Sequence, residues 1–340
     1  MPNLCVIHED DSIKVYNGIG EQLFSANESG ELFPDVKGWY LRECNLLVIS
    51  EDNDAANQDN ETDMLYPAHV YQPKSGGSSI MLPGHYNGIE VVVDSPDAKY
   101  IASCGNDGRI KIHDLKGDLI SAYDHEANHL VFASCGWLVV VKNEELIVID
   151  VNKENPDFNI SIKGTEGINV RQIVRSFFVN RLSTYGQSPN HIAVWNLETA
   201  EKLLEIDFED HVYCVTPLTD QIDSQIILCG TENEIYECNV TGSEATQEVI
   251  PDMTDYTCVP VALNWGHGRC VAFGREKAVI VYDVTTKKVV REFTCNEEVD
   301  EIQCLGDSLI ACMDGSGSVY LWDIDMGELI KKIDEVKEVL

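Results

Sequence analysis

The sequence lacks the apolar segments that membrane or secreted proteins need. None of the apolar runs in its 340 residues reaches the roughly 20 residues of a membrane-spanning helix. The start, MPNLCVIHED, has no basic segment followed by an apolar stretch, as a secretory signal would. We therefore expect a soluble protein of the cytoplasm, the nucleus or both.

Paired cysteines are missing as well. The 12 cysteines stand singly in apolar runs such as VYCV (212–215) and IILC (226–229), and no CxxC pair occurs. Disulfide frameworks and structural zinc sites rely on cysteines at close, regular spacing. We expect these cysteines to be small buried hydrophobic residues in a reducing compartment.

Basic residues are few. The chain has 24 lysines and arginines against 58 aspartates and glutamates, so its formal net charge is −34. Such a chain repels phosphate backbones and anionic membrane surfaces, so we expect no direct binding to nucleic acid or membrane. A basic protein partner is compatible with the charge. A solubilising surface explains the charge equally well, so the charge alone names no partner.

Motifs for nucleotide binding and nucleophilic catalysis are also absent. GxxxxGK[ST], GxGxxG and GxSxG do not occur. Those motifs build the loops that cradle phosphates or hold a catalytic serine on a tight turn. The sequence therefore predicts no catalytic residue and no cofactor.

Two segments resemble metal sites. HEANH, from His125 to His129, matches HExxH, which binds zinc when a helix places both histidines on one face. Its flanks, SAY and LVFASC, alternate as strands do, which favours a loop with a structural histidine. DNDAANQDNETD (52–63) has the oxygen ligands of a calcium loop but lacks its turn glycine and ends in Asp63. We predict no metal ion, and an acidic disordered insertion at residues 51–64.

Internal repetition is the strongest positive signal. Eight short apolar runs, most of them ending in Asp or Asn, recur roughly 44 residues apart on average. A period of about 40–45 residues, with turn residues between alternating strands, is typical of the four-stranded blades of a β-propeller. The eight runs are KVYN (14–17), AHVYQ (68–72), IKIHD (110–114), LIVID (146–150), IAVWN (192–196), IYECN (235–239), VIVYD (279–283) and VYLWD (319–323).

We therefore predict an all-β fold, a single β-propeller over residues 1–340 with four-stranded antiparallel blades, eight being favoured over seven. One blade cannot cover both of its apolar faces, so neighbouring blades must stack. The chain opens with LCVI (4–7) in the position of a second strand, which leaves the first blade without an inner strand. EVKEVL (335–340) is only marginally long enough to supply it, so imperfect closure is one expected outcome. An unfilled edge there would accept a strand from a partner.

Residues 84–123 resemble a repeat of the WD-repeat family. In that family a Gly-His pair precedes the inner strand, Ser lies on the second strand, Asp lies in the next turn and Trp-Asp ends the third strand. The matching residues are Gly84-His85, Ser103, Asp107 and His113-Asp114, so His113 replaces the tryptophan. The resemblance implies a tetrad-like set of His85, Ser103, Asp107 and His113 that is incomplete at His113. In the last repeat, Cys312 and Ser316 occupy the serine and aspartate positions.

The resemblance also implies a binding face. Members of this family bind partners through the loops before the first strand and between the second and third strands of each blade. Tyrosine suits an interface anchor there, because it offers a rigid ring with a polar tip. Packing between blades would account for the tyrosines equally well. The candidate residues are Tyr86, Tyr213, Tyr256, Asn106, Glu232, Arg275 and Glu276.

We expect a non-catalytic scaffold or adaptor subunit of a larger hetero-complex. The alternative is an acidic chaperone or adaptor for a basic client, such as a histone or ribosomal protein. An enzyme with catalytic residues dispersed round a propeller channel is the third reading. The motifs of phosphoinositide-binding and ubiquitin-ligase propellers, Phe-Arg-Arg-Gly and Trp-Asp-x-Arg, do not occur.

Overall fold

The computed structural model describes most of the chain. The described residues are 3–26, 36–51, 65–75, 79–86, 88–127, 129–134, 136–142, 145–152, 159–162, 170–175, 181–186, 191–196, 201–218, 226–231, 234–239, 246–251, 256, 260–263, 270–306 and 308–340. The predicted acidic insertion at 51–64 lies outside them except for Glu51.

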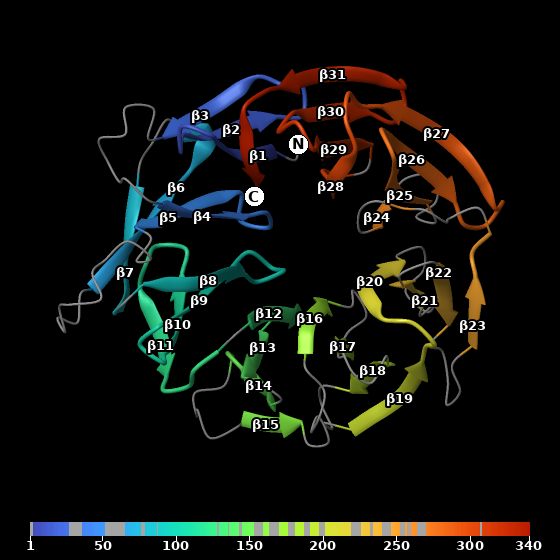
Figure 1. The fold of residues 1–340 in the computed structure, drawn as a ribbon. Helices are drawn as coiled ribbons and strands as arrows, with labels where there is room; N and C mark the ends of the chain where they lie inside the picture. The colour runs from blue at the N-terminus through green and yellow to red at the C-terminus, as the bar shows by residue number, and fades with distance from the viewer. Residues whose placement is uncertain are drawn as a thin grey trace, which may run out of the picture. The chain divides into compact units, whose positions relative to one another are not determined.

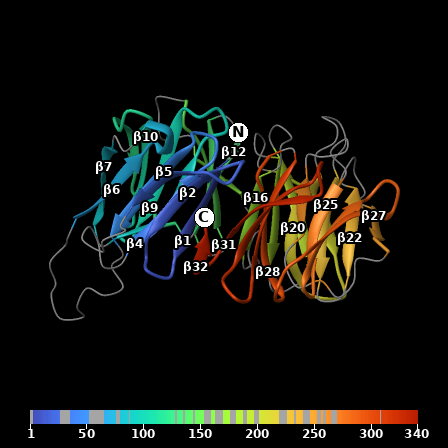
Figure 2. The ribbon, with the colours of Figure 1, turned by 90° about the horizontal axis from the view of Figure 1, so that it is seen from above.

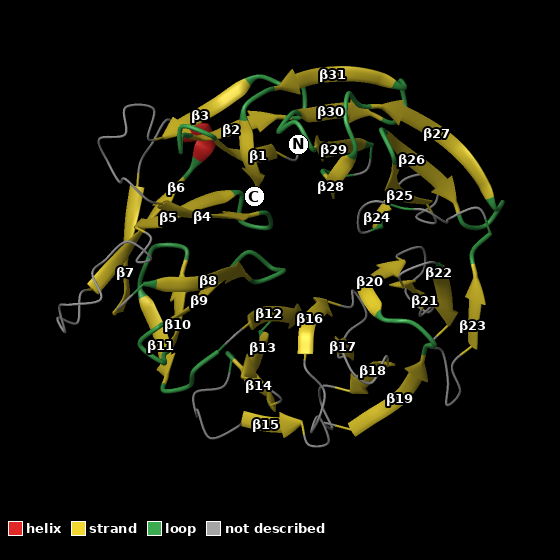
Figure 3. Cartoon of the chain, in the orientation of Figure 1, coloured by secondary structure: helices red, strands yellow, loops and turns green. Residues whose placement is uncertain are grey.

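The chain divides into two compact units. The N-terminal unit comprises residues 5–17, 21–166 and 337–340, and the C-terminal unit comprises residues 1–4, 18–20 and 167–336. The prediction of a single domain stays a prediction. Figure 1 labels the strands, and Figure 3 colours by secondary structure. The helical turn η1 (Pro73–Ser75) is the one helix among the described residues, and no described helix is long or apolar enough to span a membrane.

Four sheets lie wholly or mostly in the N-terminal unit, each of four strands. Their strands are β1 (Asn3–His8), β2 (Ile13–Asn17), β3 (Gln22–Ala26) and β32 (Val336–Val339); β4 (Val36–Leu41), β5 (Leu46–Glu51), β6 (Leu65–Tyr71) and β7 (Ser79–Tyr86); β8 (Ile89–Asp94), β9 (Tyr100–Gly105), β10 (Ile110–Asp114) and β11 (Leu119–Tyr123); and β12 (His129–Ser134), β13 (Trp137–Lys142), β14 (Glu145–Asp150) and β15 (Asn159–Ile162).

The C-terminal unit holds another four sheets of four consecutive strands. Their strands are β16 (Val170–Arg175), β17 (Arg181–Gly186), β18 (His191–Asn196) and β19 (Glu201–Asp207); β20 (Val212–Leu218), β21 (Ile226–Thr231), β22 (Ile235–Asn239) and β23 (Thr246–Val249); β24 (Val261–Leu263), β25 (Cys270–Arg275), β26 (Ala278–Asp283) and β27 (Lys288–Thr294); and β28 (Val299–Cys304), β29 (Leu309–Asp314), β30 (Val319–Asp323) and β31 (Glu328–Ile333).

The eight repeated runs of the sequence all form third strands. They lie in β2, β6, β10, β14, β18, β22, β26 and β30, each between the second and fourth strands of its sheet. Consecutive strands of the sheets pair antiparallel, as β9, β10 and β11 do. The predicted all-β fold of four-stranded antiparallel blades is confirmed.

The Asp or Asn that ends these runs has a structural reason. Asp114 Oδ1 accepts hydrogen bonds from the backbone N–H groups of Lys116 (2.8 Å) and Asp118 (3.0 Å). A side-chain oxygen that binds the backbone two to four residues ahead stabilises the turn into the fourth strand. Asp150, Asp283 and Asp323 form the same kind of bond.

The third strands are apolar because sheets within each unit stack face to face. In the N-terminal unit, Ile112 of β10 packs in one cluster with Phe132 and Leu138 of the following sheet. In the C-terminal unit, Val281 of β26 and Ile310 of β29 share another cluster. Fourth strands are more exposed, and all four residues of β23 face solvent. Burial of the inner strands on both faces is the main apolar contribution to stability.

The C-terminal strand fills the position that the sequence left open. β32 pairs with β1 and completes the sheet β3-β2-β1-β32, and the two lie side by side in Figures 1 and 2. The backbone N–H of Leu340 donates to the carbonyl of Cys5 (2.9 Å), and Lys337 Nζ lies 2.9 Å from Asp11 Oδ1. The expected gap in the first blade, and with it the edge for a partner's strand, is therefore occupied by the chain itself.

Substitutions in β32 test this pairing. Val339 is buried and its neighbour Glu338 is exposed. We expect Val339→Asn to lower the free energy of unfolding by about 2 kcal/mol, because it places an amide in an apolar site. Glu338→Asn, which introduces the same residue, should change it by less than about 0.5 kcal/mol. Urea unfolding measures both, and equal losses would contradict the pairing of β32 with β1.

Candidate functional site

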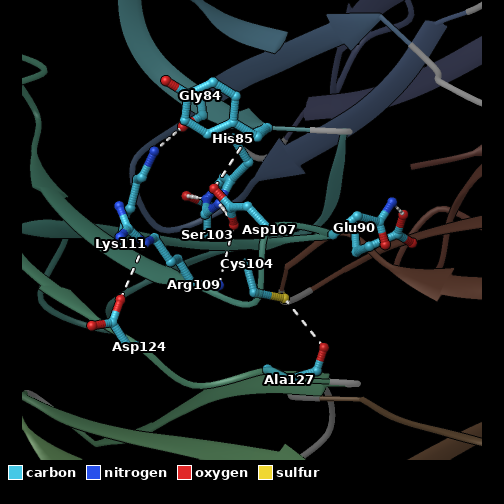
Figure 4. A network of polar contacts seen from close by, with 12 residues as sticks. Gly84, His85, Glu90, Ser103, Cys104, Asp107, Arg109, Lys111, Asp124 and Ala127 are labelled. Atoms are coloured by element: carbon cyan, nitrogen blue, oxygen red, sulfur yellow. Dashed lines mark hydrogen bonds and ion pairs between the residues drawn. The ribbon is translucent and has the colours of Figure 1, made fainter. Parts of the chain in front are cut away.

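A chain of three buried polar side chains joins the end of β7 to the sheet β8–β11. His85 is fully buried, and its Nδ1 lies 2.8 Å from Asp107 Oδ1 while its Nε2 lies 2.8 Å from Ser103 Oγ. Figure 4 shows the three side chains converging between these strands. With the proton on Nδ1, His85 donates to the carboxylate and accepts from the serine hydroxyl. The structure thus brings together three members of the predicted tetrad.

Asp107 anchors the loop that enters the sheet. Its carboxylate also accepts from the backbone N–H groups of Tyr86 (3.2 Å) and Arg109 (3.1 Å). Burial acts to raise the pKa of Asp107, but hydrogen bonds from His85 and the backbone outweigh it and lower that pKa. Burial also lowers the pKa of His85, so the imidazole is neutral at pH 7. These groups hold the backbone at Tyr86 and Arg109 in place.

Two positions near His85 require glycine. Gly84 has φ +58, and a Cβ there would lie 1.6 Å from the carbonyl oxygen of Tyr66. A Cβ on Gly105 would lie 2.5 Å from the Cβ of His85 and 2.4 Å from the carbonyl oxygen of Gly88. No side chain larger than hydrogen fits at either position. The Gly-His pair of the sequence is therefore a packing requirement.

His113, the fourth predicted member, stands apart from the chain of hydrogen bonds. It is 1% exposed, and neither of its ring nitrogens bonds to a described residue. Burial, followed by the charge of Lys111, lowers the pKa of His113 to about 4. A buried imidazole without a partner costs free energy, and the cost grows when the unfolded state can take up a proton.

The predicted binding residues of the N-terminal unit lie at the same loop end. Tyr86 follows His85 and is 44% exposed. Asn106 is exposed, and its Nδ2 donates to Glu90 Oε1 (2.9 Å). Lys37 Nζ lies 3.7 Å from the same carboxylate. An aromatic ring beside charged and amide groups is available here to a partner.

The predicted residues of the C-terminal unit have different environments. Tyr256 is half-buried against the apolar cluster of β21, β25 and β26, and its hydroxyl donates to the carbonyl of Thr231. Arg275 lies over the ring of Phe273 at 5.4 Å, and Glu276 is exposed in the following turn. Tyr256 thus packs against its own unit, and its role in partner binding stays a prediction. The Tyr213 side chain and Glu232 lie outside the described residues.

The last sheet, β28–β31, has different residues at the tetrad positions. Cys295 precedes β28 by the same interval as His85 precedes β8, and Cys312 matches Ser103 in the middle of its strand. The two sulfur atoms lie 3.4 Å apart where His85 and Ser103 form their hydrogen bond. Ser316 replaces the aspartate, and its Oγ donates to Asp314 Oδ1 (2.6 Å).

Asp314 takes over the anchoring role in that sheet. Its Oδ2 accepts from the backbone N–H of Glu297 (3.1 Å) and from the hydroxyl of Tyr320 (3.0 Å). Burial acts to raise its pKa, but the hydrogen bonds from Ser316, Glu297 and Tyr320 lower it. Sequence reasoning missed Asp314 because the carboxylate has moved from the turn to the end of β29. The Asp-Gly-Ser-Gly-Ser run at 314–318 is the signal that could have found it.

The HEANH segment does not have the geometry of a zinc peptidase motif. Its described residues before Asn128 form a loop, and His129 begins β12. Within the described part of the chain, no group of three or more His, Cys, Asp or Glu side chains could hold a metal ion. None of the nine cysteines whose side chains are described forms a disulfide, and seven of them are buried.

His113 gives the protein a specific sensitivity to acid. At pH 7 it is neutral in both states, whereas between about pH 6.5 and 4 the unfolded chain binds a proton that the folded chain excludes. Stability therefore falls as the pH falls through this window. We expect His113→Phe to remove roughly 2–3 kcal/mol of that loss. Chemical unfolding from pH 7 to 4 measures this loss, with His129→Phe, at an exposed histidine, as the control. If both variants lost stability with falling pH as the unmodified protein does, His113 would not be the source of the acid sensitivity.

Asp314 should matter for stability far more than an exposed aspartate. We expect Asp314→Asn to lower the free energy of unfolding by about 2 kcal/mol at pH 7, because an amide cannot accept all the hydrogen bonds of the carboxylate. Asp300→Asn, an exposed change of the same kind, should cost less than about 0.5 kcal/mol. The native pKa of Asp314 is lowered, so its contribution disappears as the pH falls below about 3.9. If Asp314→Asn still lowered the free energy of unfolding in strong acid, the ionised carboxylate would not be the source of the effect.

Comparison with known proteins agrees with this geometry. Residues 76–114, which hold the His85, Ser103 and Asp107 chain, match the family model described as WD domain, G-beta repeat. No curated protein matches the sequence. Among solved structures, Sqt1 of Chaetomium thermophilum, bound to the N-terminus of ribosomal protein L10, is 13% identical with a TM-score of 0.61, covering 85% of this chain and 84% of that one.

Two further structures share the fold. The β-propeller domain of Cps50 (Swd1) from Myceliophteria thermophila is 12% identical with a TM-score of 0.56, covering 84% of this chain and 95% of that one. The dihydro-heme d1 dehydrogenase NirN is 10% identical with a TM-score of 0.71, covering 100% of this chain and 74% of that one. Identities this low establish a common fold and nothing about activity. The chain thus has one stretch, residues 76–114, that is similar to a WD repeat, and a β-propeller fold that it shares with these structures.

Proposed function

We propose that this propeller is a non-catalytic adaptor that holds a lysine- or arginine-rich segment of a partner protein. Propellers with WD repeats serve as protein-interaction modules, and that general role fits the fold and the matched repeat. The finer proposal depends on one observation, the placement of exposed carboxylates at one loop end of the C-terminal unit.

This acidic loop end consists of Glu276, Glu297, Glu298, Asp300 and Glu335, all exposed. Backbone hydrogen bonds hold the loops together: the N–H of Val299 donates to Glu276 O, and the N–H of Gly315 donates to Glu298 O (both 2.9 Å). Lys277 Nζ lies 2.8 Å from Glu297 Oε2.

The chemistry of this surface suits a cationic partner. An isolated exposed ion pair contributes only about 0.2–1 kcal/mol, so a single lysine would not bind measurably. Several carboxylates on adjoining loops bind a partner with several positive charges more tightly than a single cation. Their combined electric field also raises the association rate of such a partner. The net charge of −34 extends the same field over the chain. The described carboxylates thus favour a basic segment over a single ion.

The solved relatives offer support by analogy. Sqt1, a propeller of similar fold, is bound to the N-terminus of a ribosomal protein, which is a segment and not a small molecule. NirN shows that the same fold can belong to a dehydrogenase. In this chain, the hydrogen-bonded side chains of His85, Ser103 and Asp107 anchor a loop. A scaffold contact through the exposed ring of Tyr86 is the second candidate function, since aromatic anchors are typical of stable interfaces.

Salt separates these two functions. We expect a synthetic lysine-rich peptide to bind the full chain at low ionic strength and to lose at least tenfold in affinity between about 50 and 300 mM salt. A glycine- and serine-rich peptide of the same length should not bind. Isothermal titration or fluorescence anisotropy measures both. Affinity for the basic peptide that does not change with salt would exclude the electrostatic mode.

Charge removal locates the surface. The triple change Glu276→Gln, Glu298→Gln and Asp300→Asn should weaken peptide binding by about tenfold, the sum of three pairs worth about 0.5 kcal/mol each. A matched control removes three exposed carboxylates elsewhere in the same sheets: Glu292→Gln, Asp325→Asn and Glu328→Gln. It should weaken binding less than about twofold. Equal losses would show that general charge, and not the acidic loop end, attracts the peptide.

A further inference from the structure

The thiol pair at the tetrad position of the last sheet has no counterpart in the sheet β8–β11. Cys295 is 4% exposed and Cys312 is 1% exposed, and their sulfur atoms lie 3.4 Å apart. A disulfide bond is about 2.05 Å long, so the sulfur atoms need to approach by only about 1.4 Å. His85 and Ser103, at the same positions of β8–β11, can form only a hydrogen bond.

The two cysteines differ in how firmly they are held. Cys312 lies within β29, paired on one side with Ile302 of β28 and on the other with Tyr320 of β30. Cys295 lies in the loop between β27 and β28, where its N–H donates to the carbonyl of Lys277 (2.7 Å). Its neighbours Thr294 and Asn296 are exposed. The loop cysteine is therefore the one that a small solute can reach by a local shift.

We propose that Cys295 and Cys312 are a redox-active pair that a hydroperoxide oxidises to a disulfide within the chain. The Cys295 thiolate attacks the peroxide oxygen, which breaks the O–O bond, gives a sulfenic acid on Cys295 and releases hydroxide or water. The Cys312 sulfur then attacks the sulfenic sulfur and displaces its oxygen as a second water. Two thiols and one hydrogen peroxide give one disulfide and two waters, with two electrons passing from sulfur to oxygen.

The environment of Cys295 favours it as the attacking thiol. The Cys312 thiol donates to the Cys295 sulfur and so lowers the pKa of Cys295, although burial and the charge of Asp314 oppose the shift. Burial raises the pKa of other described thiols, to about 12 for Cys104 and about 11 for Cys270. Because the thiolate is the reactive form, Cys295 should react ahead of them.

Oxidation would change the loop that carries part of the acidic loop end. A bond between Cys295 and Cys312 ties the segment Asn296–Glu298 directly to β29, in addition to the hydrogen bond from Glu297 N–H to Asp314. This inference goes beyond the proposed function, since thiol chemistry is measured without any partner.

Peptide mapping of the full chain tests the pair. Reduced protein is treated with hydrogen peroxide, its remaining thiols are alkylated in denaturant, and the digest is analysed by mass spectrometry. We expect a cross-linked peptide that joins Cys295 to Cys312 and disappears with dithiothreitol. A β-dicarbonyl probe added to Cys312→Ser should trap a sulfenic acid on Cys295. Serine fits there, since Ser103 has the same place in β9.

Matched variants make the outcome decisive. Cys238→Ser, at a buried cysteine of β22, should keep the cross-link, whereas Cys295→Ser and Cys312→Ser should abolish it. Two findings would overturn the proposal: both thiols still alkylated after other cysteines are oxidised, or Cys295 bridged to a different cysteine. The map of the unmodified protein decides this even if a variant fails to fold.

Discussion

A four-stranded sheet that is apolar on both faces cannot exist alone in water, and this constraint shapes every level of the structure. The strands β10 and β26 bury side chains on both sides, so each sheet must be covered by its neighbours within its unit. The loops between sheets then have to enter at fixed positions. Buried polar groups such as Asp107 and Asp314 perform that task, because backbone N–H groups entering an apolar interface must find acceptors.

Asp107 and Asp314 hold the incoming loop of their sheets in the same way, although the residues around them differ. In β8–β11 the carboxylate lies in the turn and is oriented by His85, whereas in β28–β31 it lies at the strand end and is oriented by Tyr320 and Ser316. Both carboxylates accept a backbone N–H from the incoming loop, and in both the pKa is lowered by those hydrogen bonds. What is retained is an ionised acceptor in a partly buried position. In β28–β31 the thiols of Cys295 and Cys312 occupy the positions that His85 and Ser103 have in β8–β11.

Local features made most of the fold predictable from the sequence. The alternation of each third strand and the Asp at its end are set by contacts within a few residues, as Asp114 and Asp283 show. The His85, Ser103 and Asp107 chain was predictable for another reason, since these residues match a family pattern. Asp314 was not, because a carboxylate displaced by two residues falls outside any fixed spacing. The approach of Cys295 to Cys312 depends on strand pairing, which no local pattern encodes. The completing role of β32 was underestimated because the connection before it is shorter than in the preceding repeat.

The sheet that β32 completes has a consequence for the order of folding. Lys337 and Asp11 are in contact although 326 residues separate them along the chain. The entropy of closing so long a loop grows only slowly with its length, but we expect contacts between residues this far apart in the sequence to form late. During synthesis from the N-terminus, β1 to β3 must wait until all the other described strands have been made. Throughout that time β1 has an unpaired edge, and such an edge is open to pairing with the strands of other chains.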